Sequence, residues 1–413
     1  MQDTDFKEII HRHLIQKTDF IKVKDTMNED QLRVFVDKAI TTVCYEEQLQ
    51  VTTEQRIRLI RELVSAVVSL GPLRQFIEDN SVSEIMVNGA HQIYIQRRGK
   101  IELSGVTFDS NEHLLHTIQK LLASSGTSRR VDESNPFVDF PLVDGTRVNV
   151  ILPPCSLVGP VMTIRKFSDS IGSVEDLLQL KMLNKEMADF LVASMVAKLN
   201  IVFCGATGTG KTTALNVMSR HIPEGERIIT IEDTPELRLK QKHVVTLQSK
   251  MANIEGKGAI SIRDLFVNSL RMRPDRLIIG EVRSSEMLDL IESISSGHAG
   301  SLAIVHADSP EDCFSRMVTM MLMTGIRLST RIIEKQVSRA IDLIVHIELF
   351  SDGVRRVNNI TDVCWNPDKE CPELRDIFEF VQTGHDSQGK IDGIWKKDPR
   401  RPSFYSKFAK KHV

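Results

Sequence analysis

Apolar residues near the N-terminus recur at intervals of three and four, which is the period of an amphipathic helix. The pattern predicts three helices, over Phe6 to Leu14, Leu32 to Val43 and Ile57 to Val68. The third follows Thr52-Thr53-Glu54-Gln55, a capping-box pattern, and ends at Gly71-Pro72. We interpret residues 1–71 as a small helical bundle that stabilises or docks the chain.

Between residues 73 and 182 the pattern changes to alternation of apolar and polar positions, which is typical of half-buried strands. The expected elements are a helix from Leu114 to Leu122 and the strands Ser83–Gly89, His91–Gln96, Ile101–Phe108, Phe140–Val150 and Val161–Phe167. Together they predict an α+β domain. Arg147 and Arg165 lie on two of these strands. An arginine on a strand is commonly a solvated residue, but it can also stabilise a phosphoryl group in transfer from an adjacent domain or subunit.

Residues 183–350 contain short, continuous apolar runs, which are typical of buried strands in a parallel sheet. The run Ile201–Cys204 is followed by a glycine-rich turn and then by a helical pattern. The spacing Gly205-x4-Gly210-Lys211-Thr212 is the P-loop pattern in the strand, loop and helix context that it requires. The residues expected to hold nucleotide phosphates are Gly205, Ala206, Thr207, Gly208, Thr209, Gly210, Lys211, Thr212 and Thr213. In such loops the lysine pairs with the β- and γ-phosphates, and the threonine hydroxyl can ligate Mg²⁺.

Acidic residues follow two further apolar runs of this region. Ile228–Ile231 is followed by Glu232, Asp233 and Glu236, and Arg276–Ile279 is followed by Gly280 and Glu281. Ligands of open α/β sheets gather at the carboxyl ends of the strands, so these acids are candidates for metal binding or for positioning water. Glu281 stands near the place where such sites usually carry an aspartate, and a glutamate suits a water-polarising base as well as a metal-shell role.

Two histidines, His298 and His306, flank the apolar run Leu302–Val305. A lone histidine is more often structural than catalytic, but this pair could sense a γ-phosphate or the neighbouring carboxylates. A zinc site needs more ligands than this segment offers.

Composition narrows the function classes. The 413 residues are 41% hydrophobic and 26% charged with a formal net charge of −2, so the chain lacks the basic excess of most nucleic-acid-binding domains. Its six cysteines form no CxxC pair, which indicates reduced thiols in a cytosolic protein. No apolar run approaches the roughly 18 residues that span a bilayer, and the acidic N-terminus has no signal-peptide layout. We therefore expect the chain to reach a membrane only by recruitment.

The last segment, residues 351–413, is predicted to be a hairpin and a basic tail. Asp352-Gly353 forms a turn between Ile344–Leu349 and Val354–Ile360, and after Pro367 the chain becomes polar. Lysines and arginines at 396, 397, 400, 401, 407, 410 and 411 alternate with aromatic residues. This end could contact anionic lipid or an acidic partner, or it could be a solvated tail that packs on the rest of the protein.

Four ordered segments, GATGTGKT at 205–212, IITIEDTPEL at 228–237, RMRPDRLIIGEVR at 271–283 and GHAGSLAIVHA at 297–307, resemble the Walker A, Asp box, Walker B and His box of the secretion ATPase superfamily. This superfamily serves type II and type IV secretion and type IV pilus systems, and the details look closest to the CpaF/TadA pilus-assembly branch. SEIMVNG at 83–89, SRRVDES at 128–134, DGTRVNV at 144–150, TIRKF at 163–167 and NIEGKG at 253–258 support the resemblance.

The resemblance implies a fold, an activity and partners. It implies an α/β protein in which a RecA-like P-loop ATPase domain follows an α+β N-terminal domain, with ATP and Mg²⁺ bound between them. It also implies a homo-hexamer in the cytoplasm, at the inner face of the membrane, that drives a platform protein for pilus assembly or protein secretion. No direct contact with nucleic acid is expected. A nucleotide-gated structural switch and a DNA-transfer ATPase remain as alternatives.

By the same resemblance, residue roles are carried over position by position. Lys211 and Thr212 hold phosphates and Mg²⁺, with Glu232 beside the metal, and Glu281 is the base. Glu232, Asp233 and Glu236 match the Asp box, and His298 and His306 match the His box. Arg147 and Arg165 match the arginines that reach the nucleotide from the N-terminal domain.

Overall fold

The computed structural model describes residues 29–46, 52–57, 59–60, 71–97, 99–125, 130–142, 145–166, 171–250, 257–386 and 389–411. The chain forms two compact units, Met1–Ser168 and Asp169–Val413. The predicted helix over Phe6 to Leu14, part of the third predicted helix and most of the segment NIEGKG lie outside the described residues. The domain boundaries predicted near residues 72, 182 and 350 remain predictions.

The first unit is built on a six-stranded antiparallel sheet with the order β3-β2-β1-β6-β5-β4. Its strands are β1 Val82–Asn88, β2 Ile93–Arg97, β3 Lys100–Leu103, β4 Phe137–Pro141, β5 Arg147–Ile151 and β6 Val161–Arg165. Alternate residues of β1, such as Ile85 and Val87, are fully buried in the core of this unit. The alternation read from the sequence therefore marks the face of the sheet that packs inward.

Two strand predictions in this unit were wrong. The segment predicted as one strand over Phe140–Val150 is a hairpin of β4 and β5, because the chain reverses at Gly145, whose N–H donates to the carbonyl of Leu142. The strand predicted to reach Phe108 ends at Leu103, and the chain that follows is irregular although Phe108 itself is buried.

The helices of this unit agree with the sequence pattern where they are described. They are α3 Glu29–Glu46, the 3-10 turn η2 Gly71–Leu73, α5 Arg74–Glu78 and α6 Asn111–Ser124. The predicted capping box is present: Gln55 N–H donates to the hydroxyl of Thr52, and Thr52 N–H donates to the side chain of Gln55. Residues 53–57 and 59–60 are helical. The described parts of the predicted bundle thus have the expected conformation.

The second unit contains a nine-stranded sheet with the order β15-β14-β13-β12-β7-β11-β10-β8-β9. The strands are β7 Ile201–Gly205, β8 Ile228–Glu232, β9 Val244–Gln248, β10 Arg276–Ile279, β11 Leu302–His306, β12 Leu343–Leu349, β13 Arg355–Asn366, β14 Cys371–His385 and β15 Ile391–Lys397. From β9 to β12 the neighbours are parallel, and from β12 to β15 they are antiparallel. The carboxyl ends of β7, β8, β10 and β11 therefore share one edge.

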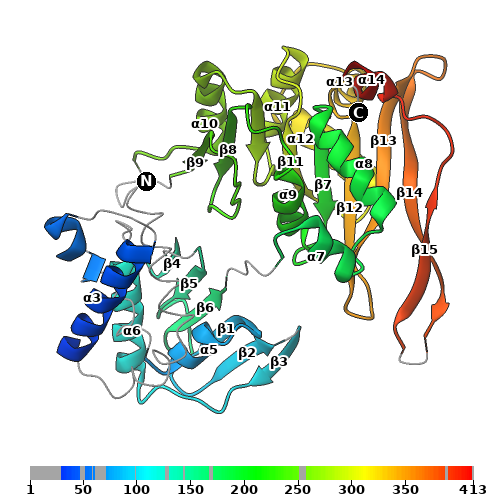
Figure 1. The fold of residues 1–413 in the computed structure, drawn as a ribbon. Coiled ribbons are helices and arrows are strands. Elements are labelled where there is room, and N and C mark those ends of the chain that lie inside the picture. The colour runs from blue at the N-terminus through cyan, green and yellow to red at the C-terminus, as the bar shows by residue number, and fades with distance from the viewer. Residues whose placement is uncertain are drawn as a thin grey trace. The chain divides into compact units, whose positions relative to one another are not determined.

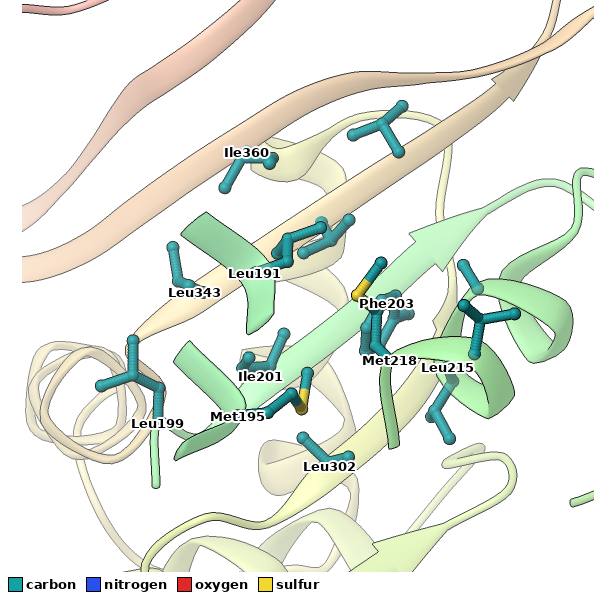
Figure 2. Packing of buried hydrophobic residues seen from close by; sticks show 14 of the residues in the cluster. Leu191, Met195, Leu199, Ile201, Phe203, Leu215, Met218, Leu302, Leu343 and Ile360 are labelled. Carbon is teal, nitrogen blue, oxygen red and sulfur yellow. The ribbon is translucent and has the colours of Figure 1, made fainter. Parts of the chain in front are cut away.

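Helices cover both faces of this sheet, as Figure 1 shows. The helices are α7 Val174–Gln179, α8 Lys185–Val196, α9 Lys211–Ser219, α10 Ile262–Ser269, the 3-10 turn η3 Leu270–Met272, α11 Glu286–Ser295, α12 Pro310–Met323, α13 Thr330–Ala340 and α14 Tyr405–Lys411. Along β7, Ile201 and Phe203 face α8 and α9, while Val202 and Cys204 face the core under α11 and α12. Figure 2 shows the first of these layers, with Met195 and Met218 against β7.

The C-terminal segment is more ordered than a basic tail. The predicted hairpin around Asp352-Gly353 is present, but β14, β15 and α14 extend the unit beyond it. Phe404 and Phe408 are buried, and their rings pack on Phe190 of α8. Lys407 Nζ donates to both carboxylate oxygens of Asp342 at 2.7 Å. The segment therefore packs on the rest of the unit, as predicted, but Phe404 and Phe408 are buried and not solvated.

Candidate active site at the P-loop edge

The loop between β7 and α9 has the conformation that the P-loop pattern predicts. Gly205, Gly208 and Gly210 have φ values of 150°, 79° and 98°, in the region that side chains disfavour. At Gly205 a Cβ atom would lie 2.2 Å from the carbonyl oxygen of Ile347, so no larger residue fits there. The glycines therefore meet both a conformational and a steric requirement of this turn.

The loop presents backbone donors. Within the described part of the chain, the N–H groups of Gly208, Thr209 and Gly210 donate to no protein acceptor. Lys211 begins α9 and is buried, and its Nζ donates to the carbonyls of Gly205 at 2.9 Å and Ala206 at 2.6 Å. A ring of amides at a helix N-terminus with one buried ammonium group is suited to an anion.

At the end of β8, Glu232 supports the loop that follows it. One of its oxygens, Oε1, accepts hydrogen bonds from the N–H groups of Glu236 at 2.9 Å and Leu237 at 3.1 Å. On its other side, a Cβ atom at Gly280 would lie 2.6 Å from Cγ of Glu232. The glycine that follows β10, where an acid is usual, thus makes room for the carboxylate from the neighbouring strand.

Glu281, the next residue, lies between two basic side chains. Its Oε1 is 3.1 Å from Nε2 of His306, and its Oε2 accepts a hydrogen bond of 2.5 Å from Nη2 of Arg283. His306 ends β11 and pairs in register with Gly205 of β7. The P-loop, His306 and Glu281 therefore occupy three consecutive positions along the same edge of the sheet.

The electrostatics of this cluster fix its protonation state. Burial raises the pKa of Glu281, but the hydrogen bond and charge of Arg283, with His306 and Lys211, bring it below its ordinary value. Burial and the positive charge of Lys211 lower the pKa of His306, although Glu281 opposes this. At neutral pH the pair is a carboxylate and a neutral imidazole. Such a carboxylate can accept a proton and hydrogen-bond a water molecule.

His298 lies away from this cluster. It precedes β11, and its ring contacts the carbonyl of Ser293 at the end of α11. Because Leu302 pairs with Ile201 and His306 pairs with Gly205, His298 lies toward the opposite edge of the sheet. The two histidines read from the sequence as flanking one strand are thus separated by its length, and a catalytic role for His298 remains a prediction.

The other two acids of the predicted Asp box lie near Glu232 with different contacts. Asp233 accepts a hydrogen bond of 2.7 Å from the hydroxyl of Ser249 and lies 3.8 Å from Nη1 of Arg283. Glu236 is held through its backbone, which bonds to Glu232 and to the side chain of Asn216. Arg283 therefore connects Asp233 with Glu281.

Arg147 and Arg165 lie in the first unit. They are directly opposite each other on β5 and β6, and Arg165 is also opposite Glu84 of β1. Residues that are opposite in an antiparallel pair share a face of the sheet, so the two arginines place two positive charges together. Glu84, opposite Arg165 on β1, lies on the same face and offsets part of their repulsion.

The residues at the sheet edge suit Mg²⁺ that is held largely by phosphates. Among the described residues, no group of three or more His, Cys, Asp or Glu side chains could hold a metal ion by itself. Mg²⁺ characteristically takes few protein ligands and keeps waters and substrate phosphates. Thr212, partly exposed in the first turn of α9, offers a hydroxyl beside the loop. Glu232 fits this role less well, because its carboxylate is bonded to its own loop.

Comparison with known proteins shows the family of this chain. The family described as "Type II/IV secretion system protein" matches residues 66–371. The chain belongs to this family. A type IV secretion system protein VirB11 of Bartonella quintana is 30% identical over 363 residues, covering 78% of this chain and 98% of the relative. A Mycobacterium tuberculosis protein, named as a candidate for conjugal transfer, is 28% identical over 307 residues, covering 73% of this chain and 86% of the relative.

The solved structure of an ATPase with low sequence identity to this chain has the same fold. The ATPase DotB of Yersinia pseudotuberculosis is 17% identical and matches with a TM-score of 0.50, covering 74% of this chain and 80% of DotB. The predicted fold class, a P-loop α/β domain after an α+β domain, is confirmed by the two units and their sheets. In the described residues, no helix has both the length and the apolar character needed to cross a membrane.

Two arginines that the sequence reasoning passed over belong to this edge of the sheet. Arg283 stands two residues after Glu281 and contacts both Glu281 and Asp233. The acidic residues predicted at this edge of the sheet could have indicated that a nearby arginine pairs with them. Arg355 begins β13, and its Nε donates to the carbonyl of Gly208 in the P-loop at 2.8 Å. No local pattern could have found Arg355, because 147 residues separate it from its partner.

Proposed function

We propose that this chain hydrolyses ATP and uses the reaction to power pilus assembly or protein secretion. Membership of the type II/IV secretion family supports a role in a secretion or pilus system. The observation that carries the reaction is the placement of Glu281 against His306, in register with the first glycine of the P-loop. A phosphate-binding loop beside an ionised carboxylate is the arrangement that hydrolysis of a γ-phosphate needs.

In this proposal the loop binds the triphosphate. The amides of Gly208, Thr209 and Gly210 contact phosphate oxygens, and Lys211 exchanges its carbonyl partners for the β- and γ-phosphates. The hydroxyl of Thr212 ligates Mg²⁺, which when bound neutralises charge that develops on the phosphates. Because phosphoryl transfer depends mainly on positioning and charge stabilisation, these groups supply much of the catalysis.

Glu281 activates the attacking water. Its carboxylate orients the water and accepts a proton as the oxygen bonds to the γ-phosphorus and the bond to the β-phosphate oxygen breaks, giving ADP and phosphate. His306 is neutral, and its Nε2 lies 3.1 Å from Oε1, so it restrains the position of Glu281 without adding a charge. Arg283 restrains the other oxygen and has to loosen its contact for the carboxylate to take up the proton.

Coupling to motion is the second part of the proposal. Arg147 and Arg165, paired across β5 and β6, bring positive charge from the N-terminal unit to the nucleotide. ATP binding and hydrolysis would then change the relation between the units, within a homo-hexamer whose motions act on a membrane platform. We place the protein in the cytoplasm at the inner face of the cytoplasmic membrane, bound through that partner.

The test separates a motor from a nucleotide-gated switch. Cells whose only copy carries Glu281→Gln are assayed for pilus assembly or export, while the purified variant is assayed for phosphate release. The proposal predicts loss of both. Normal assembly without hydrolysis would exclude the motor and favour the switch.

A DNA-transfer ATPase is the second candidate, and the Mycobacterium tuberculosis relative named for conjugal transfer is the observation in its favour. The net charge of −2 is against direct DNA contact. Phosphate release measured with and without single- and double-stranded DNA decides between them. The leading proposal predicts no stimulation, and a several-fold stimulation that salt abolishes would support DNA transfer.

A further inference from the structure

Arg355 connects the C-terminal hairpin with the phosphate-binding loop. Its Nε donates to the carbonyl oxygen of Gly208 at 2.8 Å, and its Cδ would lie 3.4 Å from a Cβ atom placed on Gly210. Among the residues that the structure describes, this is the guanidinium's only hydrogen bond, and the side chain is exposed. The arginine thus lies against the loop without belonging to the core.

The contact determines which way one peptide group of the loop faces. In a trans peptide the carbonyl of one residue and the N–H of the next point in opposite directions. Of the described peptide bonds only Pro153–Pro154 is cis, so the Gly208–Thr209 bond is trans. When Arg355 holds the Gly208 carbonyl, the N–H of Thr209 therefore points away from Arg355.

Little else restrains this peptide. Gly208 has a φ of 79°, which glycine adopts readily, and a Cβ atom there would meet nothing within 4 Å, so no packed side chain holds this residue in place. Thr209 N–H has no acceptor within the described residues, whereas the Thr209 hydroxyl donates to the carbonyl of Ala206 at 3.0 Å. The Thr209 hydroxyl therefore restrains the loop at Ala206, and Arg355 restrains it at Gly208.

The hairpin that carries Arg355 is itself rigid. The next residue, Arg356, is buried, and its two Nη atoms donate to Asp352 at 2.9 and 2.7 Å. Asp352 also accepts hydrogen bonds of 3.0 Å from the N–H groups of Val354 and Ile391. Arg356 lies 5.0 Å above the ring of Phe350. Through Asp352, the turn before β13 and the start of β15 thus hold in place the beginning of β13, which carries Arg355.

We propose that Arg355 is a positioning residue for the nucleotide. It fixes the Gly208–Thr209 peptide so that Thr209 N–H faces the phosphates, and it makes the C-terminal hairpin part of the nucleotide site of its own chain. The inference rests on the proposed function, because it requires nucleotide phosphates in the loop. Losing the contact lets the peptide rotate, which turns an acceptor toward the phosphates in place of a donor.

The test measures binding of a fluorescent ADP with Mg²⁺ to the purified full chain. Arg355→Ala is expected to bind roughly tenfold more weakly, the loss typical of one hydrogen bond to a charged group. Arg355→Lys should recover part of the affinity, and free guanidinium should restore part of it to Arg355→Ala. Arg327→Ala, which removes another exposed arginine from the same unit, is the control and should bind like the unchanged protein.

Steady-state kinetics separate positioning from general damage. The orientation of one amide affects substrate and transition state alike, so KM should rise with kcat nearly unchanged. Unchanged ADP affinity and KM in Arg355→Ala would overturn the inference while leaving the proposed hydrolysis intact. So would a loss that guanidinium and Arg355→Lys both fail to reverse. If Arg355→Ala does not fold, Arg355→Gln is measured with the same expectations. Absence of binding by the unchanged protein would overturn the proposed function and this inference with it.

Discussion

Oε1 of Glu281 lies 3.1 Å from Nε2 of His306, so the carboxylate and the imidazole are in direct contact at the edge of the sheet. The pair joins β10 and β11 at the level where β11 meets the first glycine of the P-loop. The register of β11 with β7 fixes His306 beside the P-loop. Glu281 contacts His306, so its carboxylate also lies near the P-loop. The sequence indicated both residues but not their contact.

The protonation state of the pair predicts the pH dependence of the reaction. The pKa of Glu281 is below its ordinary 4.5 and that of His306 is below its ordinary 6.5. The active form, with an ionised acid and a neutral imidazole, therefore predominates above pH 6.5 and is lost at lower pH. Measured with MgATP, kcat/KM should be level between about pH 7 and 8. An acid limb centred above pH 7 would contradict this assignment.

Gly280→Ala tests the contact between the acids of neighbouring strands. The new Cβ would lie 2.6 Å from Cγ of Glu232, which has to move and weaken its bonds to Glu236 and Leu237. We expect the free energy of unfolding to fall by about 1–3 kcal/mol, as for other overpacked sites. Denaturant unfolding measures it. The control, Gly225→Ala, meets no atom within 4 Å and should lose nothing.

Lys407→Met tests whether the C-terminal helix is part of the ATPase unit. Burial raises the pKa of Asp342, and Lys407 opposes this rise. An acid with a raised folded pKa loses stability as the pH rises from its unfolded value through its folded value. Without Lys407 the folded pKa rises further, so the variant should be destabilised more at pH 7.5 than at pH 5, by about 2 kcal/mol at the higher pH.

Thermal unfolding at the two pH values measures this difference. Lys410→Met changes an exposed lysine of the same helix and should show no pH-dependent loss. A loss of equal size at both pH values would mean that Lys407 acts by packing alone.

The arginine pair of the first unit should contribute to activity and not to stability. Arg147 and Arg165 are opposite each other across β5 and β6, and Arg165 is also opposite Glu84, so replacing one arginine removes a repulsion together with an attraction. Arg147→Gln and Arg165→Gln should therefore change the melting temperature little, while phosphate release falls at least tenfold. A lower melting temperature with unchanged turnover would make the pair structural.

The sequence predicted best what depends on neighbouring residues. Gly205, Gly208 and Gly210 show the P-loop turn directly, because only glycine suits these backbone angles. Asp144-Gly145 is a turn signal in the sequence, but the strand prediction continued through it, and the structure has a hairpin there. β14 and β15 were missed because polar residues alternate along them and glycines interrupt them, so they read as a tail.

What the sequence could not predict are contacts between distant segments. The close approach of Gly280 to the side chain of Glu232 arises because β10 lies beside β8. His306 contacts Glu281 because β11 and β10 are neighbours in the sheet. Arg355 reaches Gly208 only because β12 and β13 lie beside β7. These relations follow from the order of strands in the sheet, which local periodicity does not encode.

The most direct test of the account is the rate of phosphate release by purified Glu281→Gln at saturating MgATP, measured together with its affinity for ATP. Glutamine keeps the size of the side chain and removes the proton acceptor, so the rate should fall at least a hundredfold while ATP still binds. Glu224→Gln, which changes an exposed acid of the same unit, should turn over normally. Undiminished phosphate release by Glu281→Gln would contradict the role of Glu281 and the mechanism built on it.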